Sequence, residues 1–211
     1  MKIVSTGSTL SSPEFLEKRN KARRRRTTFW IAGILALLVI AVIISRREEF
    51  LISEVSVSGA IVVKEEDIAL AVEAIISGHY LFLVPKGNAL IYPGGQIEKK
   101  LLQAFPRLSA VAASLEGMRL LRIDAAEREP FALYCSSALS PEDASECYFL
   151  DDNGFIFDEA PSFSGSVYFI YAKVPPLPEP VGREFLPTEE FKPLSQFIGS
   201  LEDLGIEPLA L

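Results

Sequence analysis

The side chains that could carry chemistry in this chain are few and lie far apart in the sequence. Cys135 and Cys147 are its only cysteines, and they flank a polar loop between two predicted strands. If these strands form a hairpin, the cysteines face each other, and a disulfide would stabilise the chain by about 2–3 kcal/mol. Two free buried thiols are the alternative. A zinc site needs three or four ligands and a catalytic thiol needs a histidine, whereas the only histidine, His79, belongs to another region.

Two acidic clusters could suggest a metal site or acid–base catalysis. The run Asp151–Gly154 lacks the spacing and the terminal glutamate of a calcium loop. A type I′ hairpin turn at Asn153-Gly154, with positive φ at both positions, explains it better. The run Glu127–Glu129 could hold a catalytic carboxylate, but a solvated strand end explains it more simply. Because no nucleotide-binding, serine hydrolase or zinc protease motif occurs, we expect no enzyme, no cofactor and no metal.

An apolar run behind a basic cluster determines where these groups lie relative to a membrane. Residues 27–45 contain no charge and no proline, and they are long enough to cross a bilayer core of roughly 30 Å. Seven Lys/Arg precede this run from Lys18 to Arg26, so the positive-inside rule predicts that everything after Ser45 is extracytoplasmic. A cleaved signal peptide is the rival interpretation, but no small-residue cleavage site follows the run.

The formal net charge of −7 is divided unevenly along the chain. Residues 1–26 hold eight Lys/Arg and two Glu, a charge of +6, and the remainder holds 13 Lys/Arg and 26 Asp/Glu, a charge of −13. Such an acidic exterior argues against nucleic acid and against docking on anionic lipid. About 165 residues follow the anchor, enough for one or two small domains.

Beyond the anchor, the hydrophobic pattern predicts strand, helix, helix, strand, strand. The first helix opens on acidic residues, which complement the helix dipole, and it stops at Gly78, whereas the second stops at Pro106. Glu116-Gly117 supplies the turn between the last two strands. The expected elements are a strand over Phe50–Val57, helices over Lys64–Ser77 and about Gly95–Phe105, and strands over Ser109–Leu115 and Arg119–Glu127.

The remainder of the chain predicts short strands and one helix. A proline-rich connection precedes apolar residues at helical spacing, which predict a helix over Thr188–Leu204. The expected strands are Phe131–Cys135, Cys147–Asp151, Phe155–Phe157 and Ser166–Val174.

Several short motifs follow one another in an order that points to a family. They are ISEVSVSG in the first strand, KEEDI at the first helix start, AFPRLSAV after the second helix, and LLRIDAAEREPFAL. In the last of these, Glu127, Arg128 and Pro130 form an E-R-x-P pattern, and residues 150–155 then have the form L-x-D-x-x-G before an aromatic residue. With the basic tail and the anchor, these motifs resemble the FtsQ/DivIB family of bacterial cell-division proteins.

The resemblance implies an α+β fold in four parts. These are a basic cytoplasmic tail (1–26), a single transmembrane helix (27–45), a POTRA domain of β-α-α-β-β order (50–129), and a small antiparallel β-domain with a C-terminal helix (130–211). The segment His79–Gly94 departs from the family, because it is longer and more apolar than a minimal loop. The family continues with further strands where this chain stops at Leu211, so we expect a truncated β-domain or one whose pairing another chain supplies.

The function implied by the resemblance is a non-enzymatic, single-pass scaffold of the cell-division complex in the inner (plasma) membrane. It would concentrate at the septum, bind membrane proteins of the FtsB/DivIC and FtsL type, and bind neither nucleic acid nor a small-molecule substrate. We expect Glu127, Arg128 and Pro130 to form the corner between the two external domains. The candidate partner surface consists of Val167, Tyr168, Phe169, Ile170, Phe191 and Phe197, which would act by strand addition and apolar contact.

Two other functions and one structural alternative remain open from the sequence. The same apolar residues could pack a core and not meet a partner. A POTRA-containing envelope chaperone or transport component would bind extended polypeptides, but its relatives usually carry several POTRA units. A membrane-anchored cell-wall enzyme would require several carboxylates to converge in one cleft.

Overall fold

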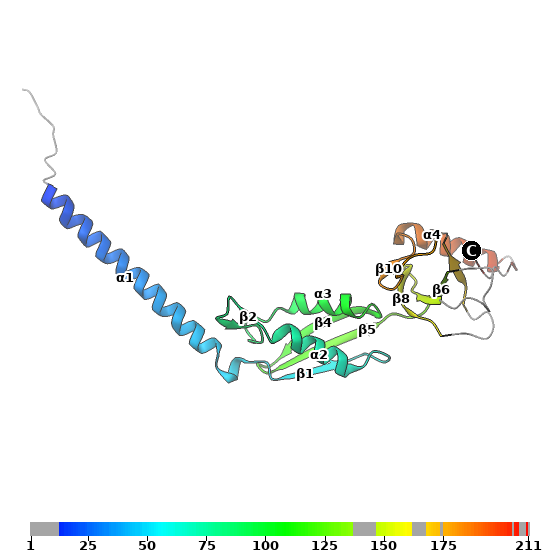
Figure 1. Ribbon diagram of the computed structural model, residues 1–211, viewed down its shortest axis with the longest axis horizontal. Coiled ribbons are helices and arrows are strands. Elements are labelled where there is room, and N and C mark those ends of the chain that lie inside the picture. The colour runs from blue at the N-terminus through cyan, green and yellow to red at the C-terminus, as the bar shows by residue number, and fades with distance from the viewer. Residues whose placement is uncertain are drawn as a thin grey trace, which may run out of the picture.

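The computed structural model describes residues 13–136, 147–161, 168–173, 175–203, 205, 206 and 210. It is an α+β chain in which one long N-terminal helix is followed by two units arranged along the long axis of the molecule (Figure 1). We call residues 48–128 the proximal unit and residues 129–206 the distal unit. Each has its own cluster of buried side chains, and the chain passes from the first cluster to the second between Ala125 and Ala132.

The N-terminal helix α1 (Pro13–Ser45) contains the apolar run. Its stretch Arg23–Ser45 has 23 residues and contains an 18-residue window with a mean hydropathy of 2.7, none of which is buried against the rest of the chain. At 1.5 Å per residue it is about 35 Å long, sufficient to cross a bilayer core. Within the part of the chain that the structure describes, it is the one helix of such length and composition, which suits a membrane anchor or a signal sequence.

The proximal unit confirms the predicted order of strand, helix, helix, strand, strand, with a hairpin added between the helices. Its elements are η1 (Glu48–Phe50), β1 (Glu54–Ser58), α2 (Glu65–Ile76), β2 (His79–Tyr80), β3 (Val84–Pro85), α3 (Gly94–Ala104), β4 (Leu108–Glu116) and β5 (Leu120–Glu127). Strand β5 is central in the order β1-β5-β4, parallel to β1 and antiparallel to β4. Helices α2 and α3 pack on this sheet (Figure 1). The first strand begins later than predicted, because Phe50 ends a 3-10 helix.

The core of the proximal unit is aliphatic. Its fully buried side chains are Ile68 and Val72 of α2, Ile97 and Leu101 of α3, Leu108 of β4, and Leu121 and Ile123 of β5. Gly59, just after β1, has a φ of +85°, and a Cβ there would lie 2.1 Å from the carbonyl oxygen of Ala125. Glycine is therefore required where β1 passes so close to β5.

The distal unit contains a five-stranded sheet covered by a helix. Its elements are β6 (Ala132–Cys135), β7 (Cys147–Leu150), β8 (Phe155–Glu159), β9 (Ile170–Ala172), β10 (Arg183–Glu184) and α4 (Thr188–Asp203). The strand order is β10-β8-β7-β6-β9. The predicted strands and helix are present, but β9 is shorter than the predicted Ser166–Val174, of which Ser166, Val167 and Val174 lie outside the described residues.

The prediction of a wholly antiparallel β-domain is wrong in one pairing. Strand β9 lies parallel to β6, whereas β6–β7, β7–β8 and β8–β10 are antiparallel. The reason is topological: β9 joins the sheet beside β6 instead of β8, so no hairpin fixes its direction. The two-residue strand β10 was not predicted, because two residues are too few to show an alternation.

The hairpin between β7 and β8 is confirmed, but its predicted turn type is wrong. Asp151 N donates to Phe155 O at 3.0 Å and Gly154 N to Asp151 O at 3.1 Å, which closes a loop over residues 152–154. Gly154 has a φ of +84°, whereas Asn153 does not have a positive φ. This is a type I turn followed by a left-handed residue. It forms because the Asp151 carboxylate accepts the N–H groups of Asn153 and Phe155, each at 2.9 Å.

Candidate functional site

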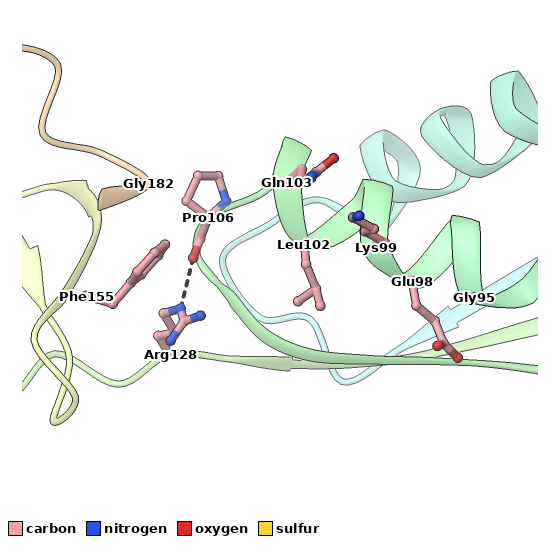
Figure 2. Close-up of a pocket in the computed structure, with 9 residues that line it drawn as sticks. All are labelled: Gly95, Glu98, Lys99, Leu102, Gln103, Pro106, Arg128, Phe155 and Gly182. Carbon is pink, nitrogen blue, oxygen red and sulfur yellow. Dashed lines mark hydrogen bonds between the residues drawn. The ribbon is translucent and has the colours of Figure 1, made fainter. Parts of the chain in front are cut away.

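The junction of the two units is a cluster of charged side chains, which we call the corner. It consists of Arg107, Glu127, Arg128, Asp151 and Asp158. Arg107, Glu127 and Arg128 belong to the proximal unit, and the two aspartates belong to the hairpin of the distal unit. Of these five residues, Figure 2 shows Arg128, which lies near the end of α3.

Glu127 ends β5, and its carboxylate accepts four hydrogen bonds. Oε1 accepts the backbone N–H groups of Ile61, Val62 and Val63 at 2.8, 2.8 and 2.9 Å. Oε2 accepts Nε of Arg107 at 3.2 Å, and the Glu127 side chain is only 9% exposed. Burial by itself would raise the pKa of Glu127, but the three N–H donors and the guanidinium outweigh it, so the pKa lies below its ordinary value.

Arg107 carries this network across to the distal unit. It lies between α3 and β4, and besides Glu127 its Nη1 donates to Asp158 Oδ2 at 2.6 Å. Its guanidinium carbon also lies 5.6 Å from the centre of the Phe157 ring. A planar guanidinium suits both interactions at once, because it donates in a fixed plane and stacks on aromatic rings.

Arg128 makes the second connection. Its Nε donates to Pro106 O at 3.1 Å, and its Nη1 donates to Asp151 Oδ2 at 2.5 Å. The guanidinium lies 4.2 Å from the centre of the Phe155 ring, an arrangement visible in Figure 2. Asp151 is almost fully buried. The same carboxylate therefore shapes the distal hairpin through one oxygen and receives Arg128 through the other.

Pro130 restricts the segment that joins the units. It lies between the end of β5 and the start of β6, is half-buried, and has a φ confined near −65° by its ring. The backbone N–H of Arg128 donates to Arg107 O at 2.8 Å, and that of Phe131 donates to Leu150 O at 2.8 Å. The linker is thus bonded to the proximal unit on one side and to the distal unit on the other.

An open cleft runs along α3 beside Arg128. Its lining residues are Gly95, Glu98, Lys99, Leu102, Gln103, Pro106, Arg128, Phe155 and Gly182 (Figure 2). The Glu98 carboxylate accepts the N–H of Ala113, and Arg128 is engaged as described. Among the described residues no group of three or more His, Cys, Asp or Glu could hold a metal ion. The corner holds its charges in ion pairs, two of which, Arg107–Asp158 and Arg128–Asp151, join the two units.

The predicted disulfide is confirmed. Cys135 and Cys147 are bonded, and they lie directly opposite each other on β6 and β7 with a Cα–Cα distance of 4.2 Å. The alternative of two free thiols is therefore wrong. The disulfide closes the end of the hairpin away from the corner.

The predicted partner surface is only partly accessible. Phe191 is fully buried against Tyr171 and Phe185, and a Cβ on Gly154 would lie 2.7 Å from its ring, so its assignment to a surface is wrong. Phe197, on the same helix, is 61% exposed. Tyr168, Phe169 and Ile170 are half-buried, and Val167 lies outside the described residues. Helical spacing alone could not tell the buried phenylalanine from the exposed one.

Sequence reasoning named Glu127, Arg128 and Pro130 for the corner but missed Arg107, Asp151 and Asp158. Arg107 follows Pro106, the residue that predicts the end of a helix. This pattern indicates where Arg107 lies along the chain but does not indicate which side chains it contacts. Asp151 was interpreted only as part of a turn. These side chains come from points 20 to 51 residues apart, and no local pattern pairs them.

Comparison with known proteins does not assign a family. No protein-family model matches this chain, and no curated protein matches it.

Proposed function

We propose that this protein is a membrane-anchored, non-enzymatic scaffold of the bacterial division complex, of the FtsQ/DivIB kind. In this proposal α1 spans the inner membrane with its N-terminus in the cytoplasm, the proximal unit is a POTRA domain, and the distal unit is the β-domain. The observation that carries the proposal is the corner, where the Glu127-Arg128-x-Pro130 sequence lies at the junction and is bonded to both units.

Such a corner has a mechanical consequence. A scaffold that must present several binding surfaces at once binds more tightly when those surfaces are held in a fixed relation, because less freedom is lost on binding. The ion pairs Arg107–Asp158 and Arg128–Asp151 hold the distal unit against the proximal unit. The charges involved are paired, so the corner supports a structural role better than a catalytic one.

Strand β9 offers the means of partner binding. It is an edge strand, and among the described residues only Ala210 bridges to its outer side, at Ile170. An edge with free backbone donors and acceptors can accept an extended segment from a partner of the FtsB/DivIC or FtsL type. Phe197 adds an exposed aromatic side chain to the same unit. Both are targets for substitution once a partner is found.

The test is the position of a fluorescent protein fused to the N-terminus in dividing cells. Concentration at the constriction site is expected, and a matched fusion that ends at Arg47 keeps α1 and should remain evenly distributed. An even distribution of the full-length fusion would overturn the division role. Binding to unfolded envelope polypeptides in that case would favour the chaperone or transport alternative.

A further inference from the structure

The hairpin β2–β3 presents large apolar side chains at its tip. Leu81, Phe82 and Leu83 connect the two strands and are 87%, 93% and 53% exposed. Leu90 and Ile91, shortly after the hairpin, are 65% and 46% exposed. Single exposed apolar residues are ordinary on a protein surface, but a group of this size marks a surface that contacts something else.

The backbone at this tip is strained as well. Leu81 and Phe82 have φ values of +48° and +62°, and Leu83 N donates to Tyr80 O at 3.0 Å. These are the features of a type I′ turn, where Asn and Gly are preferred because larger side chains crowd the following carbonyl. Leucine and phenylalanine are poor choices for this turn in water, which argues that their side chains act outside the chain.

Hydrogen bonds fix the tip beside the end of α1. Nε of Arg46 donates to Leu83 O at 3.0 Å, and its Nη2 donates to Phe82 O at 3.4 Å. Arg46 directly follows Ser45, the last residue of α1. In Figure 1 the hairpin lies at the end of the proximal unit nearest to α1. The tip is therefore at the level where the apolar helix ends.

A buried asparagine holds the base of the hairpin in the same place. Asn88 Nδ2 donates to Ser45 O at 2.8 Å, and its Oδ1 accepts the N–H of Leu90 at 2.9 Å. The backbone N–H of Ala89 donates to Phe50 O at 2.8 Å. The segment after β3 thus pairs with the segment that leaves α1, and Leu90 is held next to the helix end.

Resting on the proposed anchoring of α1 in the bilayer, we propose that the β2–β3 tip inserts into the extracytoplasmic leaflet. Leu81, Phe82 and Leu83 would enter the boundary between headgroups and acyl chains, next to the point where α1 leaves the bilayer. A lipid occupant is inferred from continuity with α1. The carbonyl groups of Phe82 and Leu83 accept hydrogen bonds from Arg46, the first residue after a helix that has no buried residue in its apolar stretch.

The neighbouring charges favour apolar insertion over attraction to anionic lipid. Arg46, Arg47 and Lys86 are nearly balanced by Glu48 and Glu49. Lys86 Nζ also lies 5.9 Å from the centre of the Tyr80 ring, and tyrosine and lysine are both residues that anchor proteins at the membrane interface. Insertion should therefore occur equally in vesicles without anionic lipid. The consequence is a second membrane attachment that restricts how the proximal unit tilts about the end of α1.

The experiment measures the depth of a fluorescent label on the full chain in phosphatidylcholine vesicles. Both natural cysteines are in the disulfide, so Phe82→Cys introduces the only thiol for labelling. We expect a nitroxide near the headgroup end of the acyl chain to quench this label strongly, with a blue shift of its emission. The control is Ile61→Cys: Ile61 is 89% exposed and apolar but lies at the opposite end of the unit, beside Glu127, so no quenching is expected.

A third label separates this inference from the proposed anchoring. Leu38→Cys lies within α1, and its label should be quenched by a nitroxide near the methyl end of the acyl chain. Quenching at position 38 without quenching at position 82 would overturn the inserted tip and leave the anchor intact. No quenching at either position would overturn both proposals. The label at position 82 could instead show a blue-shifted emission that grows with the number of protein molecules per vesicle and is not quenched by nitroxide lipid. That result would overturn lipid insertion in favour of contact with a second copy of the chain.

A further variant tests whether the apolar side chains cause the insertion. Leu81→Asn combined with Phe82→Gly suits the turn geometry, so the hairpin is retained. In this test the label is attached to a cysteine introduced by Leu90→Cys. We expect quenching when Leu81 and Phe82 are natural, and a clear loss of quenching when both are replaced. Unchanged quenching would show that the tip side chains do not hold this surface on the membrane, which would overturn the proposal.

Discussion

The corner and the β2–β3 tip lie near opposite ends of the proximal unit, and each reverses the usual placement of side chains. At the corner, charged groups are largely buried, and hydrogen bonds and ion pairs within the chain satisfy them. At the tip, apolar groups are exposed, and nothing described in the chain covers them. The comparison teaches where a partner should be sought: the charges of the corner are paired with one another, whereas among the described residues the apolar side chains of the tip have no such cover.

The largest effect should come from removing the carboxylate at the corner. Glu127→Ala leaves three backbone N–H groups and Arg107 without their acceptor, so we expect a loss of about 2–4 kcal/mol in the free energy of unfolding. Denaturation of the detergent-solubilised full chain, followed by the near-ultraviolet circular dichroism of its tyrosines, measures this loss. The matched control is Glu116→Ala, since the Glu116–Arg122 pair is exposed and should contribute about 0–1 kcal/mol. Equal losses in both variants would contradict the comparison.

A smaller loss of unfolding free energy is expected when Arg128 is replaced by lysine, which keeps the positive charge but lacks the planar guanidinium. Arg128→Lys cannot bond Pro106 O and Asp151 together while stacking on Phe155. We expect a loss of about 1–2 kcal/mol, and faster hydrogen exchange of the β7–β8 hairpin by mass spectrometry. Exchange that is faster throughout the proximal unit but unchanged in this hairpin would argue against a junction role.

Acid should weaken the corner in a defined direction. The pKa of Glu127 is lower in the folded chain than in the unfolded one, so its contribution to stability is complete above the ordinary glutamate pKa of about 4.3. It is lost as the pH falls through the folded-state pKa. Denaturation at a series of pH values should therefore show a steeper decline below that value for the natural chain than for Glu127→Gln. Identical slopes would show that Glu127 does not contribute.

The smallest effect is expected at the tip, and it should be neutral or opposite in sign. Leu81→Asn with Phe82→Gly relieves two left-handed positions, so we expect the free energy of unfolding in detergent to stay the same or to rise by about 1 kcal/mol. The same denaturation measurement applies. A loss as large as that of Glu127→Ala would mean that the tip packs within the chain, and the contrast between the two regions would then disappear.

The sequence by itself determined the local elements of this protein. The spacing of apolar residues gave α2, α3 and the alternating strand β5, because these patterns depend on neighbours within a few residues. The uncharged run gave residues 27–45 of α1, whereas the helix itself begins at Pro13. The hairpin that carries Cys135 and Cys147 was also predictable, since two strands joined by a polar loop bring their ends together. The E-R-x-P pattern even marked where the units join.

The tertiary structure alone decided which of these elements meet. The partners of Arg107 and Arg128, the parallel pairing of β9, and the burial of Phe191 but not Phe197 all depend on contacts between distant segments. The turn types at Asn153 and at Leu81–Phe82 also depend on such contacts. The Asp151 carboxylate, which binds Arg128, imposes a type I turn at Asn153, while the hydrogen bonds from Arg46 to Leu83 O and Phe82 O hold the left-handed turn at Leu81 and Phe82. Local preference sets what each segment favours, and contacts across the fold decide which conformation it keeps.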